Sequence, residues 1–179
     1  MTCGSFNAEN AEARRARRRF GRKDSNTALR KIESVLKLRE LVGQEVGAGE
    51  WVEVSQARID RFAEATEDRQ WIHTDAERAA RESPFKGTVA HGFLTLALLS
   101  ELLRTAVSVG GVRMGINCGL NRVRFVAPVP AGSRVRGRFV LTALEEIRGG
   151  VEAAWGVTVE REGRDKPCCV AEWLVRYYV

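Results

Sequence analysis

The sequence contains few of the residues that build metal sites and disulfide scaffolds, with two histidines and four cysteines among 179 residues. The cysteines are Cys3, Cys118 and the adjacent Cys168 and Cys169, so no Cys-x-x-Cys pair is present. A structural zinc site needs such a pair or more histidine, and we therefore expect no metal. Because no signal peptide is recognisable, we interpret the cysteines as free thiols in a reducing compartment and expect a cytoplasmic protein.

Long apolar runs are also missing from the sequence. The most apolar stretch, residues 93–103, is interrupted by Ser100 and Glu101. No run therefore reaches the roughly 18 residues that suggest a membrane span. The hydrophobic content of 44% is nevertheless that of a globular protein able to bury a core. The length fits a single domain with a short appendage.

The net charge of +6 is confined to the first part of the chain. Residues 1–31 hold nine Lys and Arg and three Asp and Glu, which accounts for the whole excess. We interpret this stretch as a basic, disordered tail, with a nucleic-acid-binding arm or a targeting peptide as alternatives. Residues 32–179, which carry no net charge, are expected to form the folded domain.

The hydrophobic pattern predicts helices in the first half of the chain. Apolar residues at helical spacing predict a helix over residues 31–46, and residues 51–54 form a short strand candidate. Ser55 is placed to cap a helix that ends near Glu67, and Thr74 or Asp75 to cap a short helix that ends before Ser83-Pro84. A strongly apolar helix begins at Gly92 and is expected to be buried on most sides until Gly110-Gly111 end it.

The second half of the chain alternates apolar and polar residues in the manner of strands. Four strands are predicted, over residues 114–125, 133–144, 151–160 and 167–178, and the short links between the last three suit antiparallel neighbours. One buried helix followed by such strands favours an α+β fold in which the sheet wraps around the helix.

Both histidines fall in one short window, and an aspartate precedes the first of them. Asp68 and His73 are five residues apart, and five residues of helix would turn by about 140°, so an irregular turn is needed to bring the two side chains together. An acid and an imidazole that converge in this way can take and return protons. His91, beside the start of the apolar helix, is interpreted mainly as a packing or hydrogen-bonding residue.

Three motifs in the expected order resemble the MaoC-like dehydratases, in particular the branch with nodulation-protein-N-like and (R)-specific enoyl-CoA hydratase members. They are D-R-Q-W-I-H-T-D (68–75), G-T-V-A-H-G-F-L-T-L (87–96) and G-L-N-R-V-R-F-V-A-P-V-P-A-G-S (119–133). The resemblance implies a hot-dog fold, a homodimer, and hydration of a trans-2-enoyl-CoA, or of the corresponding carrier-protein thioester, to the (R)-3-hydroxyacyl thioester. It implies no cofactor.

The resemblance also implies roles for individual residues. Asp68 and His73 stand where the family keeps its catalytic pair. Gly92 stands where a backbone N–H holds the thioester carbonyl, and Ser100 where a hydroxyl supports the site. From their apolar character, we expect Trp71 and Phe93 to surround the site and exclude water. The chain departs from the family at Glu67, where many members have glycine, and this loss restricts the backbone.

Three other functions remain open from the sequence. A thioesterase of the same fold would use Asp68 or Glu67 to direct water at the carbonyl carbon. A non-catalytic acyl-thioester-binding protein, or a subunit that supports a partner, would keep the fold without the reaction. Nucleic-acid binding through residues 14–23 would depend steeply on salt concentration.

Overall fold

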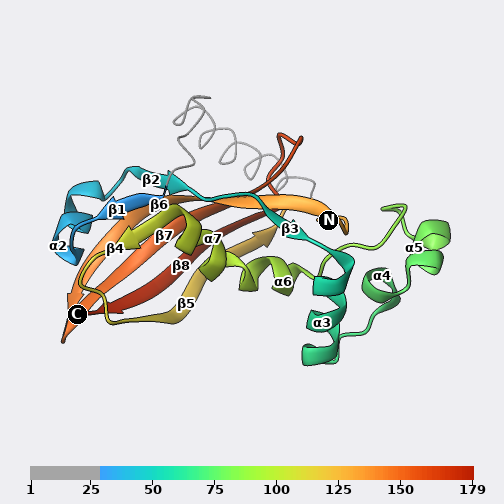
Figure 1. The fold of residues 1–179 in the computed structure, drawn as a ribbon, viewed down its shortest axis with the longest axis horizontal. Coiled ribbons are helices and arrows are strands. Elements are labelled where there is room, and N and C mark those ends of the chain that lie inside the picture. The colour runs from blue at the N-terminus through green and yellow to red at the C-terminus, as the bar shows by residue number, and fades with distance from the viewer. Residues whose placement is uncertain (1–28) are drawn as a thin grey trace, which may run out of the picture.

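The computed structural model describes residues 29–179 (Figure 1). The expectations for the basic tail therefore lie almost wholly outside the described residues. The first described strand, β1 (Arg30–Ile32), pairs in parallel with β4 (Val107–Val109). The boundary expected between residues 31 and 32 thus falls inside β1, because Arg30 and Lys31 are bound into this small sheet.

A six-stranded antiparallel sheet curves around the central helices, which confirms the α+β hot-dog architecture (Figure 1). The strand order is β2-β6-β7-β8-β5, with β3 also paired to β6. Along β7, buried residues alternate with partly exposed ones, because successive side chains point to opposite faces of a sheet. The bounds are β2 (Glu45–Ala48), β3 (Val52–Val54), β5 (Met114–Phe125), β6 (Ser133–Ile147), β7 (Gly150–Arg161) and β8 (Cys169–Tyr178).

The helix predicted from Gly92 is in fact two helices in sequence. These are α6 (Gly92–Ala97) and α7 (Leu99–Ala106), joined at Leu98. The inner face of the two helices is buried under the sheet through Leu94, Leu98, Leu99, Leu102 and Leu103. The helix does not continue to Gly110 as predicted, because the chain leaves it after Ala106 to form β4 against β1.

The helix predicted over residues 31–46 is mostly wrong. The segment contains β1, a single turn α2 (Val35–Leu38), a 3-10 turn η1 (Arg39–Leu41) and the start of β2. Leu38 is fully buried, whereas Leu36 is 72% exposed. Pairing of the two ends with β4 and β6 determines the conformation here, and it overrides the local helical pattern.

Three further helices lie beyond one end of the sheet (Figure 1). In α3 (Gln56–Thr66), Ser55 accepts a hydrogen bond from the Arg58 N–H, and this confirms the predicted cap. The next two are α4 (Trp71–Thr74) and α5 (Ala76–Glu82), and Asp75 caps the latter. Among residues 29–179, no helix is long and apolar enough to cross a membrane.

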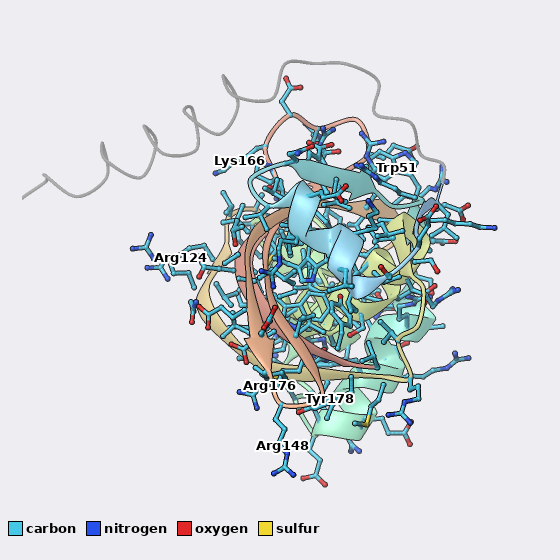
Figure 2. All side chains as sticks on the ribbon, turned by 90° about the vertical axis from the view of Figure 1, so that its left-hand side faces the viewer. Trp51, Arg124, Arg148, Lys166, Arg176 and Tyr178 are labelled. Atoms are coloured by element: carbon cyan, nitrogen blue, oxygen red, sulfur yellow. The ribbon has the colours of Figure 1, made fainter. Side chains whose placement is uncertain are left out.

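The outer face of the sheet carries charges of both signs. Arg138 on β6 pairs with Glu45 on β2 at 2.7 Å, and Arg176 on β8 pairs with Glu152 on β7 at 2.7 Å. Figure 2 shows the side chain of Arg176 projecting from the strands into solvent. This pairing agrees with the lack of net charge in residues 32–179 and gives no support to a basic nucleic-acid-binding face on the sheet.

Glycine allows the sheet to approach α7 closely. A Cβ atom added to Gly137 on β6 would lie 2.6 Å from Cζ of Phe139 and 3.1 Å from Cβ of Leu102. Both of those side chains are fully buried. The contact between β6 and α7 therefore depends on the missing side chain at position 137.

We expect Gly137→Ala to lower the free energy of unfolding by about 1–3 kcal/mol, which is the usual effect of forcing a methyl group into a packed core. Gly87→Ala is the matched control, because a Cβ there meets no atom within 4 Å. Urea denaturation measures both variants. Equal midpoints for the two proteins would contradict the close contact between sheet and helix.

Candidate active site

The candidate site lies where the end of α3, the short helix α4 and the start of α6 come together. Helix α3 ends at Glu67, whose backbone is left-handed with φ 60° and ψ 10°. Residues 67–70 have no regular structure, and α4 begins at Trp71. The stretch from Asp68 to His73, which was expected to be non-helical throughout, is irregular at residues 68–70. The expectation is wrong for residues 71–73, which begin α4.

His73 is held by a short hydrogen bond that determines its tautomer. The side chain is 8% exposed, and its Nδ1 lies 2.6 Å from the carbonyl oxygen of Val89. A carbonyl oxygen only accepts hydrogen bonds, so Nδ1 carries the proton and donates it. The Nε2 atom of neutral His73 is left with a lone pair that can accept a proton.

His91 packs against His73 and also contacts the backbone of Asp68. The two imidazole rings are stacked, with their centroids 3.8 Å apart and their planes 28° from parallel. Nε2 of His91 lies 2.9 Å from the backbone carbonyl oxygen of Asp68 and donates to it. The Nδ1 atom of His91 is buried and has no hydrogen-bond partner among the described residues.

The carboxylate of Asp68 completes a compact group with the two rings. One carboxylate oxygen and one ring nitrogen from each histidine lie within 4.8 Å of one another. One water molecule that hydrogen-bonds to two groups holds them at about this separation, since each bond is roughly 2.8 Å long. The separation therefore suits a bridging water molecule.

Burial lowers the pKa of His73 from its ordinary value of 6.5. Loss of solvation is the largest cause, and the nearby His91 ring acts in the same direction. The hydrogen bond to Val89 and the charge of Asp68 oppose the shift without reversing it. His73 is accordingly neutral at neutral pH, which is the state in which Nε2 accepts protons.

Gly92 occupies the first position of α6, directly after His91. The N–H groups of a first helical turn have no intrahelical acceptor and carry the positive end of the helix dipole. A Cβ at Gly92 would lie 2.8 Å from the ring of Phe125. In this structure, Phe125 therefore uses the close approach that glycine allows.

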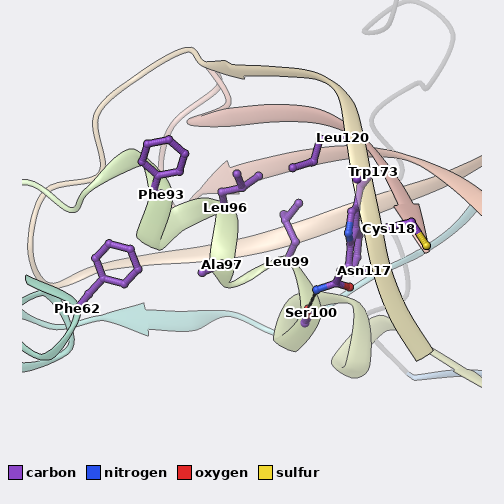
Figure 3. Close-up of a pocket in the computed structure, with 11 residues that line it drawn as sticks. Phe62, Phe93, Leu96, Ala97, Leu99, Ser100, Asn117, Cys118, Leu120 and Trp173 are labelled. Atoms are coloured by element: carbon purple, nitrogen blue, oxygen red, sulfur yellow. Dashed lines mark hydrogen bonds between the residues drawn. The ribbon is translucent and has the colours of Figure 1, made fainter. Parts of the chain in front are cut away.

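An apolar groove runs along α6 and α7 on the side of β5, with a volume of about 430 Å³ (Figure 3). Phe62 and Phe93 lie at one end, and Ser100 lies at the other, where its hydroxyl faces the Asn117 amide at 3.4 Å. Phe62 also contacts the His91 ring, with centroids 5.1 Å apart, so the groove begins beside the two histidines. Its lining residues are Phe62, Phe93, Leu96, Ala97, Leu99, Ser100, Asn117, Cys118, Gly119, Leu120 and Trp173.

The structure thus brings together some of the residues selected from the sequence and separates others. Asp68 and His73 converge beside the residue that precedes Gly92, whereas Phe93 and Ser100 belong to the groove. Phe93 is 68% exposed, so the expected burial does not hold at this position in the single chain. Trp71 does not line the groove, and its ring packs under the Arg78 guanidinium at 4.5 Å.

The structure places further residues at the site or along the groove that the sequence did not single out, among them His91, Phe62, Phe125 and Asn117. His91 was interpreted mainly as a packing residue, although its position next to Gly92 in the His-Gly pair was a usable signal. Phe62 follows Ile59 at helical spacing, and nothing in that pattern distinguished it from a core residue. Phe125 and Asn117 are on β5, far along the chain, and no local pattern connects them to α6 or α7.

The fold and the acid–imidazole group define a hot-dog protein with an acid–base site at one end of its central helices. The sequence matches the family described as "MaoC like domain" over residues 37–162. The chain belongs to this MaoC-like dehydratase family. It is accordingly an enzyme of the lyase class, a hydratase or dehydratase.

Individual relatives agree with this assignment. The chain is 51% identical over 150 residues to 3-hydroxyacyl-thioester dehydratase Z of Mycobacterium tuberculosis, covering 83% of this chain and 99% of that protein. It is 49% identical over 143 residues to nodulation protein N of Rhizobium meliloti, covering 79% and 89% respectively. The solved (R)-hydratase from A. caviae superposes with a TM-score of 0.59 at 26% identity, covering 74% and 96% of the two chains.

The left-handed conformation of Glu67 yields a prediction about stability. A non-glycine residue pays roughly 1–2 kcal/mol in this region, and glycine pays little, so we expect Glu67→Gly to raise the free energy of unfolding by about 0.5–1 kcal/mol. Glu64→Gly is the control, because Glu64 lies within α3, where glycine costs about 1 kcal/mol. Thermal unfolding should show shifts of opposite sign. A loss of stability in both variants would argue against strain at Glu67.

Proposed function

We propose that the enzyme adds water to trans-2-enoyl-CoA to give (R)-3-hydroxyacyl-CoA, or catalyses the reverse dehydration. The main support is the spacing of the Asp68 carboxylate and the His73 ring, which suits one shared water molecule. The relatives named as a 3-hydroxyacyl-thioester dehydratase and an (R)-hydratase support the thioester substrate and the (R) configuration.

In the proposed hydration, His73 and Asp68 bind the reacting water together. Nε2 of His73 takes one proton as the water oxygen bonds to C3, and the electrons of the double bond move onto the thioester carbonyl as an enolate. Protonated His73 then gives the proton to C2. Hydroxyl and hydrogen have been added across the double bond, and Asp68 remains a carboxylate throughout.

The N–H of Gly92 is the proposed donor to the thioester oxygen. Charge develops on that oxygen in the transition state, and a donor fixed in advance stabilises it by roughly 3–4 kcal/mol. For the carbonyl to reach this N–H, the ring of Phe125, which lies over Gly92, has to shift. Phe125 is 47% exposed, so its ring has room to move.

The groove along α6 and α7 is the proposed site for the acyl chain. Its lining is apolar apart from Ser100, Asn117 and Cys118, which suits a hydrocarbon tail. It starts beside the histidines, so an acyl chain lying in it would leave C2 and C3 near Asp68 and His73. We propose that Ser100 and Asn117, at the far end of the groove, limit the length of acyl chain that the groove accepts.

We expect Asp68→Asn and His73→Gln each to lower turnover of crotonyl-CoA by at least about a hundredfold, since positioned acid–base groups typically contribute 10²–10⁴-fold. Loss of the enoyl absorbance measures the rate, and circular dichroism checks the fold. Glu67→Gln is the matched control, because it removes the adjacent carboxylate and should retain the wild-type rate.

The products of the same assay separate the proposed reaction from the thioesterase alternative. Formation of 3-hydroxybutyryl-CoA without free CoA supports hydration. Release of free CoA as the main product would identify a thioesterase. Wild-type rates in both Asp68→Asn and His73→Gln would exclude this pair as the catalytic groups, and an inert wild-type protein that binds enoyl-CoA would indicate a non-catalytic binder.

We further propose that two copies of the chain pair through β5 to form a homodimer. β5 is an edge strand of the sheet, and exposed edges of this length are ready sites for pairing. It also carries exposed apolar side chains, which favour burial against a partner. These are Met114 (49%), Ile116 (41%), Leu120 (41%) and Phe125 (47%). A cytoplasmic location is also proposed, on the basis of the free thiols Cys118, Cys168 and Cys169.

Ile116→Lys is expected to convert the dimer to a monomer, because it places a charge in the proposed contact between two β5 strands. Light scattering after gel filtration measures the mass. Leu36→Lys is the matched control, since Leu36 is an exposed apolar residue on α2, away from β5. A wild-type protein with the mass of a single chain would refute the homodimer.

A further inference from the structure

The mechanism proposed above leaves unused a buried ionisable side chain that lies directly against His73. His91 is 2% exposed, and its Nδ1 is buried without a hydrogen-bond partner among the described residues. An unpaired buried polar atom costs free energy, on the order of 1–3 kcal/mol. His91 lies directly against the proposed catalytic histidine in spite of this cost. Its contacts should therefore explain why it is there.

Those contacts determine which ring nitrogen of His91 donates. Its Nε2 donates to the carbonyl oxygen of Asp68, because a carbonyl oxygen only accepts hydrogen bonds. Its Nδ1 is buried and has no hydrogen-bond partner among the described residues. The bond to Asp68 therefore sets the orientation of the His91 ring.

The same contacts hold both members of the proposed catalytic pair. The hydrogen bond to Asp68 fixes the backbone of residues 67–70, which have no regular structure of their own. The stacked ring covers one face of His73 at a centroid distance of 3.8 Å. Phe62 on α3 packs against His91 in turn, at 5.1 Å. His91 is thus the side chain that connects the Asp68 segment to the His73 ring.

We propose that His91 is a positioning residue, which holds Asp68 and His73 at the separation that one water molecule bridges. It acts through its hydrogen bond to the Asp68 carbonyl and through its stack on the His73 ring. The inference rests on the proposed function, because it assigns a role within the same site. It adds a third residue, which acts through Asp68 and His73.

The electrostatic surroundings of His73 provide a readout that a purely structural role would not change. The groups that act on its charge are Asp68, from the link before α4, and His91, from the start of α6. Helix α3 presents the neutral amide of Gln56, whose Nε2 donates to the backbone carbonyl of His73. His91 lowers the pKa of His73, so its removal should raise that pKa.

Two substitutions separate the contacts of His91. His91→Phe keeps an aromatic ring against His73 but loses the donor to Asp68, and His91→Gln keeps a donor but loses the stack. We expect each to lower kcat for crotonyl-CoA by about tenfold or more, because small errors in position are costly, with KM changed by less than about twofold. The acid limb of the kcat/KM profile lies below pH 6.5 in the wild type, since neutral His73 is required, and should move to higher pH in both variants.

Thr95→Val is the matched control for these variants. Thr95 is buried one turn further along α6, and within residues 29–179 its hydroxyl donates to the carbonyl of His91. We expect a small loss of stability with the wild-type acid limb and kcat. A shift of the acid limb in Thr95→Val equal to that in the His91 variants would reduce the role of His91 to ordinary packing.

Proton titration of His73 by NMR in the substrate-free protein keeps the outcomes distinct. A raised His73 pKa together with a lower kcat in the His91 variants supports the inference. Unchanged kcat and unchanged His73 titration in both variants would overturn it. If the wild type does not hydrate any enoyl-CoA, the proposed function fails, and a positioning role for this reaction fails with it. A raised His73 pKa in the variants would then show only that His91 and His73 interact electrostatically.

Discussion

The site depends on a reciprocal pair of hydrogen bonds between α4 and Val89. The Val89 N–H donates to the carbonyl of Ile72 at 3.1 Å, and Nδ1 of His73 donates to the carbonyl of Val89 at 2.6 Å. The first bond joins the short helix to the segment that leads into α6. The second assigns the imidazole proton to Nδ1 and leaves Nε2 as the basic atom. A helix of four residues is not stable alone, and these two bonds hold it in place together with the bond from the Gln56 amide to the His73 carbonyl.

The sheet supplies the rigidity that such a small site needs. Helices α6 and α7 are enclosed by a curved sheet, and Leu102 is fully buried between α7 and that sheet. The start of α6 is therefore fixed by the core, and the N–H groups of its first turn have no intrahelical acceptor. The apolar groove continues from this point along the exposed side of the same helices (Figure 3). The polar site at the start of α6 and the surface proposed for the acyl chain thus lie along the same two helices, α6 and α7, which the sheet supports.

The long strands in the second half of the chain were predicted closely, whereas the structure of residues 31–46 was not. In β6, β7 and β8, one face packs on the core, so the period-two pattern in the sequence identified them directly. Residues 31–46 have apolar residues at helical spacing, but their ends pair with β4 and β6. A short segment gains more from these long-range hydrogen bonds than from its own helical preference, and such partners cannot be seen in a local window.

The sequence by itself determined which side chains could perform the chemistry: a carboxylate, an imidazole and a glycine at a helix start, all within 25 residues of each other at positions 68–92. It also determined the family, through three motifs in order. Only the tertiary structure decided how those groups face each other. The stack of His73 on His91, the donating nitrogen of each ring and the placement of Phe125 over Gly92 depend on contacts between segments separated along the chain. Directional hydrogen bonds and ring contacts need three-dimensional coordinates, whereas residue identity and spacing describe only what is available to form them.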